Sequence, residues 1–152
     1  MSRVDPPSSG RTFATRELTA SEIQAVLERS WWGNLATVSG GEPYAVPVVY
    51  GYDGRWFWVA SGTGKKIECL ENNPAVCLTV VEVIGDGEDW ASVVVTGRGD
   101  LVRDPRSHLA ALRALRRQRG HMGPVGPRDA LRLARARVIR ITPREITGRA
   151  KG

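Results

Sequence analysis

The stretch Val59-Ala60-Ser61-Gly62-Thr63-Gly64-Lys65-Lys66-Ile67 organises the rest of this sequence. It continues an apolar run over residues 56–60, which predicts a strand. It leads into residues 65–72, whose apolar positions recur at helical spacing and predict a helix. A strand, a glycine-rich turn and the start of a helix are therefore expected to follow one another here.

This junction has the physical properties of a phosphate-binding site. Thr63 is expected to cap the helix, and the glycines beside it let a bound group approach the backbone closely. The free N–H groups of the first turn and the ammonium groups of Lys65 and Lys66 favour negative charge at one point. The residue spacing differs from that of nucleotide-triphosphatase loops. A capped helix with two solvated lysines is the alternative interpretation.

The totals favour one cytoplasmic domain. The chain has 152 residues, of which 41% are hydrophobic, enough for one modest core. We expect a flexible N-terminal arm over residues 1–16, the domain over 17–149 and a tail over 150–152. No apolar run indicates a secretory signal or a membrane anchor. Cys69 and Cys77 lack the partners of a disulfide scaffold or a metal site, so we expect reduced, packed thiols and no metal.

Positive charge is concentrated in the second part of the chain. Residues 103–149 carry 13 basic and 3 acidic side chains, whereas residues 1–102 carry 8 basic and 13 acidic ones. Such asymmetry is typical of nucleic-acid binding or of the steering of anionic ligands. The basic residues are mostly arginine and lack interleaved aromatic residues, which favours ordinary solvated faces and argues against nucleic acid as a partner.

Hydrophobic periodicity divides the domain into one leading helix and a strand-rich body. Thr19 and Glu22 fit a capping box, and the helix that they begin is expected to end near Gly33 with Trp31 on its apolar face. Alternating apolar residues, glycine turns and a bend at Gly97 follow. The expected strands cover residues 34–39, 42–52, 55–60, 75–83, 90–102 and 136–142, with a polar tail after the last.

A second amphipathic helix is expected to begin after Asp104-Pro105. Its expected core face carries Leu109, Leu112 and Leu115, and its expected solvent face carries Arg113, Arg116 and Arg117. Six antiparallel strands with few, short helices favour a mainly β protein with a small barrel over a parallel α/β sheet.

The expected strand over residues 44–50 is apolar on both faces. Its alternate positions are Tyr44, Val46, Val48 and Tyr50 on one face and Ala45, Pro47 and Val49 on the other. One face is expected to fill the barrel, and a partner subunit or a flat ligand would cover the other. Pro47 cannot donate to a strand ladder, so a ligand could approach at this position.

Four segments together resemble the FMN-binding split-barrel family, the relatives of pyridoxamine 5′-phosphate oxidase. They are Gly41 to Tyr50, Gly64 to Lys66 with Leu70 to Pro74, Trp90 to Gly97, and Ile146 to Arg149. The sequence looks most similar to the subgroup that includes nitroimidazole-resistance proteins. The resemblance spans residues 17–149 and implies a six-stranded antiparallel split β-barrel.

The resemblance also implies a homodimer that binds FMN in each of two clefts between its subunits. The implied cofactor-binding residues are Pro47, Val48, Val49 and Tyr50 along the isoalloxazine and ribityl chain, Ala60, Ser61, Gly64, Lys65 and Lys66 around the phosphate, and Ser92 from the other subunit. A related branch binds a deazaflavin instead, which is the alternative cofactor.

The implied function is an FMN-dependent oxidoreductase that reduces a small electron-poor substrate, with NAD(P)H as electron donor. The sequence departs from the family's pattern at two places, and each departure restricts the implied function. Val59-Ala60 stands where nitroimidazole-resistance members carry a histidine, and the C-terminus lacks the arginine motif expected for vitamin B6 oxidation. A non-catalytic flavin or haem carrier and a nucleic-acid binder are the other classes. No catalytic residue is assigned; His108 and His121 are expected at the surface, with His121 the better candidate acid.

Overall fold

A computed structural model describes residues 14–62, 64–120 and 126–151 of the chain. Its elements are β1 (Thr15–Glu17), α1 (Ala20–Arg29), β2 (Trp32–Ser39), β3 (Glu42–Tyr52), β4 (Phe57–Ser61), α2 (Lys65–Asn72), β5 (Ala75–Ile84), β6 (Asp89–Val102), α3 (Pro105–Gln118), α4 (Pro127–Arg135) and β7 (Arg137–Lys151). No helix in these described ranges is both long and apolar enough to cross a membrane.

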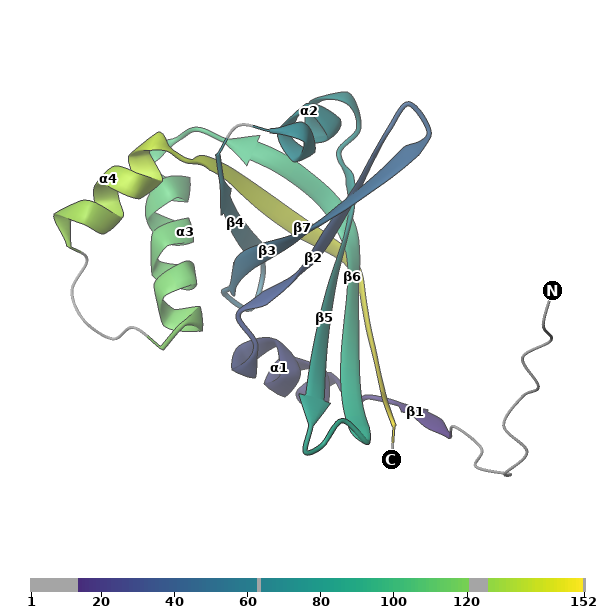
Figure 1. Cartoon of the computed structure of the whole chain (residues 1–152). Coiled ribbons are helices and arrows are strands. Elements are labelled where there is room, and N and C mark those ends of the chain that lie inside the picture. The colour runs from purple at the N-terminus through teal and green to yellow at the C-terminus, as the bar shows by residue number, and fades with distance from the viewer. Residues whose placement is uncertain (1–13, 63, 121–125, 152) are drawn as a thin grey trace.

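Six strands form an antiparallel ring, which confirms the predicted fold class (Figure 1). The neighbours run β7-β4-β3-β2-β5-β6, and β6 pairs with β7 to close the ring. The start of β7 pairs with β4, while β6 follows β7 from Val138 to Ala150. The three-residue β1 adds to the far end of β7. Helices α3 and α4 lie on one flank, with α1 at one end of the barrel and α2 at the other.

The inside of the barrel is filled by the protein's own side chains. Leu35, Leu78 and Val95 occupy successive strands at matching positions, and each has 0% exposed surface. Tyr50 is equally buried, and its hydroxyl donates a 2.8 Å hydrogen bond to the Leu27 carbonyl at the end of α1. A ligand therefore has to bind on the outer surface of this barrel.

Local sequence signals set most element boundaries correctly. Thr19 caps α1 and Glu22 completes the capping box, as predicted. The glycines Gly40 and Gly41 adopt positive φ in the β2–β3 turn, which favours glycine. The predicted bend is also confirmed, because the β6–β7 register shifts between Thr96 and Gly97.

Two predicted boundaries are wrong because strand pairing overrides local pattern. Helix α1 ends at Arg29, so Trp31 lies outside it and is 42% exposed. Trp32 begins β2 and pairs with Val49, which draws the chain out of the helix. The expected polar tail after residue 142 is strand, because β6 offers a ladder along almost the whole of β7.

Small residues bring α3 against the outer face of the barrel. Ala111 and Ala114 are buried, and they form a second core cluster with Trp58 and Val138. A Cβ added at Gly51 would lie 2.5 Å from the backbone of Ala114, so helix and strand touch here. The predicted leucine core face of α3 is confirmed only for Leu112, which packs against this cluster, because alanines make the closest contact and Leu109 is 45% exposed.

Polar contacts fix Trp58 beneath α3. Its indole nitrogen donates a 2.8 Å hydrogen bond to Asp53, which also accepts from the backbone N–H groups of Arg55 and Trp56. Burial raises the pKa of Asp53, but these hydrogen bonds outweigh burial and hold the pKa below its ordinary value. Asp53 therefore stays ionised and continues to hold the ring.

The side-chain amide of Gln118 ties the end of α3 to the barrel. Its oxygen accepts a 2.9 Å hydrogen bond from the Tyr52 N–H. Its nitrogen donates to the Leu27 carbonyl at 2.5 Å and to the Ser30 carbonyl. One side chain thus connects α3 to β3 and to the end of α1.

Substitution of Gly51 tests the contact between α3 and β3. Gly51→Ala is expected to lower the free energy of unfolding by about 1–3 kcal/mol, because the added methyl meets helix backbone that cannot rotate away. Denaturant unfolding followed by circular dichroism measures the change. Gly62→Ala is the matched control, because its added methyl meets nothing within 4 Å. Equal stability of the two variants would show that α3 does not pack tightly at Gly51.

Candidate functional site

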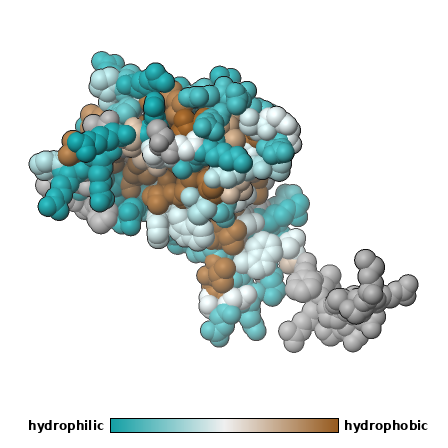
Figure 2. All heavy atoms as spheres, turned by 45° about the horizontal axis from the view of Figure 1, so that its top comes forward, coloured by the Kyte–Doolittle hydropathy of each residue, from teal (hydrophilic) through white to brown (hydrophobic). Residues whose placement is uncertain are grey.

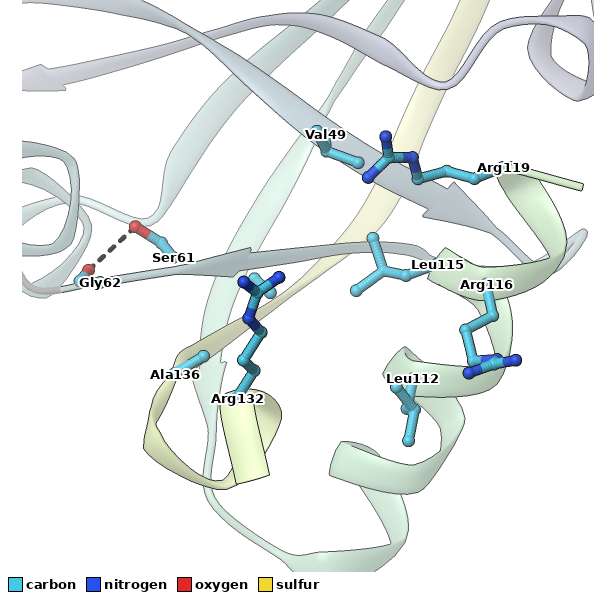
Figure 3. Close-up of a pocket in the computed structure, with 10 residues that line it drawn as sticks. Val49, Ser61, Gly62, Leu112, Leu115, Arg116, Arg119, Arg132 and Ala136 are labelled. Carbon is cyan, nitrogen blue, oxygen red and sulfur yellow. Dashed lines mark hydrogen bonds between the residues drawn. The ribbon is translucent and has the colours of Figure 1, made fainter. Parts of the chain in front are cut away.

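A cavity of about 550 Å³ lies between helices α3 and α4 and the outer face of β3 and β4 (Figure 3). We call it the arginine cavity. It is lined by Val49, Ala60, Ser61, Gly62, Leu112, Leu115, Arg116, Arg119, Arg132 and Ala136. Its volume lies within the range of about 300–1,000 Å³ that is typical of small-molecule sites.

The arginine cavity combines an apolar body with a positive rim. Leu112 and Leu115 of α3 and Val49 of β3 supply its apolar lining, while the arginine side chains come from α3, the residue that follows it and α4. None of the described residues that line it carries a carboxylate. At its strand end, the Ser61 hydroxyl donates a 2.9 Å hydrogen bond to the Gly62 carbonyl, which holds the turn after β4. The cavity is therefore suited to an organic ligand with negative charge.

A second depression continues the cavity along β3. This tryptophan recess, of about 250 Å³, is lined by Trp31, Trp32, Pro47, Val48 and Val49. Val49 belongs to both the recess and the arginine cavity, so the two surfaces meet at this residue. Together they form a mostly apolar surface on the outside of the barrel, next to the turn that follows β4.

The structure brings several predicted cofactor-binding residues to this surface. Val49, Ala60 and Ser61 line the arginine cavity, and Pro47 and Val48 line the tryptophan recess. The sequence predicted that one apolar face of β3 would need a cover from a ligand or a partner subunit. The face that carries Pro47 and Val49 indeed borders the tryptophan recess and the arginine cavity.

Tyr50 alternates to the other face of β3. Its ring lies inside the barrel, packed against Phe57 at 5.9 Å between centroids. Burial raises the pKa of its hydroxyl, which donates to the Leu27 carbonyl. The Tyr50 side chain consequently does not reach the outer surface, although its backbone borders Val49.

The two predicted lysines follow the turn but do not line the arginine cavity. The Lys65 ammonium lies 5.0 Å from the ring centroid of Tyr44, and Lys66 is half-buried. Gly64 occupies the N-cap of α2 and supplies no side-chain acceptor to the first turn. The expected cap Thr63 lies outside the described residues. Gly64 therefore leaves the first-turn N–H groups of α2 without a side-chain cap of its own, and these groups could donate hydrogen bonds to an anion.

Ser92 lies apart from both depressions. It is on the outer face of β6, opposite Val81 of β5 and Arg149 of β7. Val81 is 56% exposed and Val83 on the same strand face is 63% exposed. Ser92 therefore lies between the exposed apolar face of β5 and Arg149 of β7, and the resemblance implies that it contributes to the cofactor site of the other subunit.

The arginines that line the cavity were not predicted from the sequence as site residues. Arg116 was expected on a solvent face, but it is half-buried and lines the cavity. Leu112, Leu115, Arg116 and Arg119 have the spacing of a single helix face, and this pattern could have revealed a mixed apolar and cationic surface. Arg113 and Arg117 are exposed as predicted.

Histidine does not contribute to the arginine cavity among the described residues. His108 lies in a separate recess of about 120 Å³ with Arg103 and Arg137, and its Nε2 atom is 3.2 Å from the Val102 carbonyl. His121 lies outside the described residues. Within the described part of the chain, no three or more histidine, cysteine or acidic side chains gather as metal ligands.

Comparisons with known proteins agree on one family. The sequence model of the pyridoxamine 5′-phosphate oxidase family matches residues 19–150. No curated protein matches the chain. An FAD-binding protein from Mesorhizobium loti is 32% identical, with a TM-score of 0.72, covering 91% of this chain and 99% of that chain.

Two further solved structures show the same fold at lower identity. A protein from Bacteroides thetaiotaomicron named for 5-nitroimidazole antibiotic resistance is 20% identical, with a TM-score of 0.75, covering 90% of this chain and 87% of its own. An FAD-binding protein from Mycobacterium smegmatis is 22% identical, with a TM-score of 0.64, covering 91% of this chain and 98% of its own.

Proposed function

The chain belongs to the pyridoxamine 5′-phosphate oxidase family, and from this premise we propose that it is an FMN-dependent oxidoreductase that reduces a small electron-poor substrate. The observation that carries the proposal is that the tryptophan recess and the arginine cavity meet at Val49 on the outside of the barrel, and that the arginine cavity reaches Ser61 and Gly62, close in sequence to Lys65 and Lys66 at the start of α2. FMN has an apolar isoalloxazine ring and a charged phosphate, so it requires an apolar surface next to a positively charged one.

The residues on this surface fit a flavin. Pro47 and Val49 offer flat apolar contact for an isoalloxazine, beside the indole groups of Trp31 and Trp32. Ser61 offers a hydroxyl for a phosphate, Lys65 and Lys66 offer two ammonium groups, and the first-turn N–H groups of α2 receive no side-chain cap from Gly64. Lys65 would exchange its contact with the Tyr44 ring for the phosphate.

A second copy of the chain would cover the open side of the flavin. Trp32 is 47% exposed, and Val81 and Val83 continue the apolar surface on β5. Figure 2 shows hydrophobic side chains gathered along a band bordered by hydrophilic ones. Contiguous exposed apolar surface of this kind is typical of an interface between subunits. In the proposed homodimer, Ser92 contributes to the partner's cofactor site.

The flavin itself supplies two-electron transfer when it is bound, with NAD(P)H as the proposed donor. The proposed role of the chain's own residues is to bind the flavin and to orient it. Val49 and Pro47 support one face of the ring, Lys65 and Lys66 neutralise the phosphate, and the second subunit excludes water. This division of roles requires no catalytic triad or paired carboxylates.

FAD is the cofactor alternative that a specific observation favours. Two relatives are named as FAD-binding proteins, and the arginine cavity extends past Ser61 with additional positive charge. A deazaflavin would occupy the same outer surface. If the protein is instead a carrier without turnover, the flavin or haem that it holds would bind there too. Mass spectrometry of the ligand that co-purifies with the protein separates these cofactors.

Removal of the two lysines tests the phosphate site. The variant Lys65→Ala/Lys66→Ala is expected to bind FMN at least about tenfold more weakly, because charge-assisted contacts to the phosphate are lost. Fluorescence titration measures the affinity, and circular dichroism checks the barrel. Arg113→Ala/Arg144→Ala is the charge-matched control, since both arginines are exposed and line none of the described depressions. Unchanged FMN affinity in the lysine variant would reject the site.

Turnover distinguishes an enzyme from a carrier. Under anaerobic conditions, NADPH is expected to bleach the flavin absorbance of the purified protein, and an electron-poor nitroaromatic acceptor is expected to restore it. Stopped-flow absorbance follows both steps, with free FMN at the same concentration as the control. A protein that keeps its flavin but never cycles with NADPH or NADH would contradict the enzymatic assignment.

A charge on the exposed sheet face tests the homodimer. Light scattering of the purified protein is expected to give twice the chain mass of 16.6 kDa. Val81→Glu is expected to give the single-chain mass and weaker flavin retention, because a carboxylate cannot be buried unpaired in the interface. Leu131→Glu on α4 is the control, since it also replaces an exposed apolar side chain, 53% exposed, away from the sheet. A monomeric wild-type protein with full flavin would contradict the proposal.

A further inference from the structure

Two guanidinium groups reach into the arginine cavity from different elements. Figure 3 shows Arg132 rising from α4 toward β4, and Arg119 extending from the end of α3 toward Val49. The ion pairs formed among the described residues involve neither of them. Like charges gathered in one cavity without a carboxylate among its described lining residues raise the local positive potential. A bound anion would relieve this repulsion.

Arg119 is held in position by its neighbours. Its guanidinium carbon lies 5.0 Å from the ring centroid of Trp31, a cation–π contact that favours this position of the side chain. The preceding residue, Gln118, bonds to the carbonyls of Leu27 and Ser30. The end of α3 is thereby fixed, so Arg119 loses little additional freedom when it binds a ligand.

The space between the two arginines suits an organic body. Leu112, Leu115 and Val49 line it, and the cavity volume of about 550 Å³ far exceeds the need of a single inorganic ion. A planar guanidinium pairs with a carboxylate or a phosphate through two parallel N–H donors. The arrangement thus selects a molecule with an apolar part and one anionic group.

We propose that the α3–α4 side of the arginine cavity, opposite the Val49, Ala60 and Ser61 wall proposed for the flavin, binds the substrate, and that this substrate is a small organic anion whose carboxylate or phosphate is held by Arg119 and Arg132. The inference rests on the proposed flavin function for the identity of the reaction, but its binding chemistry depends only on the cavity. Because Val49 links the cavity to the tryptophan recess, an anion held there keeps its body next to the flavin surface.

Calorimetry with matched nitroaromatic probes tests the proposal on the protein as purified. The probes are 4-nitrobenzoate, 4-nitrophenyl phosphate and the neutral 4-nitrobenzamide. At least one anion is expected to bind about tenfold or more tightly than the amide, and comparison of the two anions identifies the preferred group. Equal affinity for all three would overturn the proposal.

Conservative variants locate the binding site. Arg119→Gln/Arg132→Gln is expected to abolish the preference for the anion and to leave affinity for the amide unchanged. Arg113→Gln, an exposed position on the same helix, is the control and is expected to retain the preference. If the double variant keeps its barrel and its flavin and still prefers the anion over the amide, the assignment is overturned.

The same variants separate this inference from the proposed function. FMN affinity of Arg119→Gln/Arg132→Gln is expected to stay within about twofold of wild type. A parallel loss of FMN and anion binding would assign the arginines to the cofactor phosphate and overturn the substrate assignment. Anion preference in a protein that binds no flavin would support the cavity assignment while rejecting the flavin function.

Discussion

Direct backbone contact between α3 and β3 at Gly51 is the constraint on which the site depends. The helix approaches so closely that alanines make the closest contact with the barrel, and Trp58 fills the space beside them. Leu112, Leu115 and Arg116 of α3 lie beside this contact, where they form one wall of the arginine cavity. Gln118 then fixes the end of the helix against β3 and α1.

A filled barrel places all ligand chemistry on its outer surface. Tyr50 and its neighbours close the interior, so the same strand presents Pro47 and Val49 outward. This outer face runs from the indole groups of Trp31 and Trp32 through Val49 to Ser61 and Gly62 at the end of β4. A flavin and an anionic substrate could therefore share one surface, with apolar contact at the centre and positive charge at the two ends.

Much of the fold could be predicted because its signals are local. The bounds of β3 and α2 and the capping box at Thr19 depend on residues close in sequence, and all agree with the structure. The errors share one physical cause. Trp31 fits a helical pattern and residues after 142 look polar, but ladder formation with β3 and β6 decides their conformation. Pairing energy between distant strands cannot be read from a local period.

The sequence by itself determined the barrel class, the family resemblance and the grouping of Pro47 with Val49 on one strand face, because period-two alternation groups residues by face without knowledge of neighbours. The burial of Tyr50 and Val48 in the folded barrel decided that this face points outward. Only the tertiary structure decided which charged groups gather beside that face. Arg119 follows α3 and Arg132 lies on α4, both far from Ser61 in sequence, and the packing of the two helices beside the barrel brings all three residues to one cavity. The count of charged residues shows that arginine is in excess in the second part of the chain. It does not show where each guanidinium group lies, because that depends on how the helices pack.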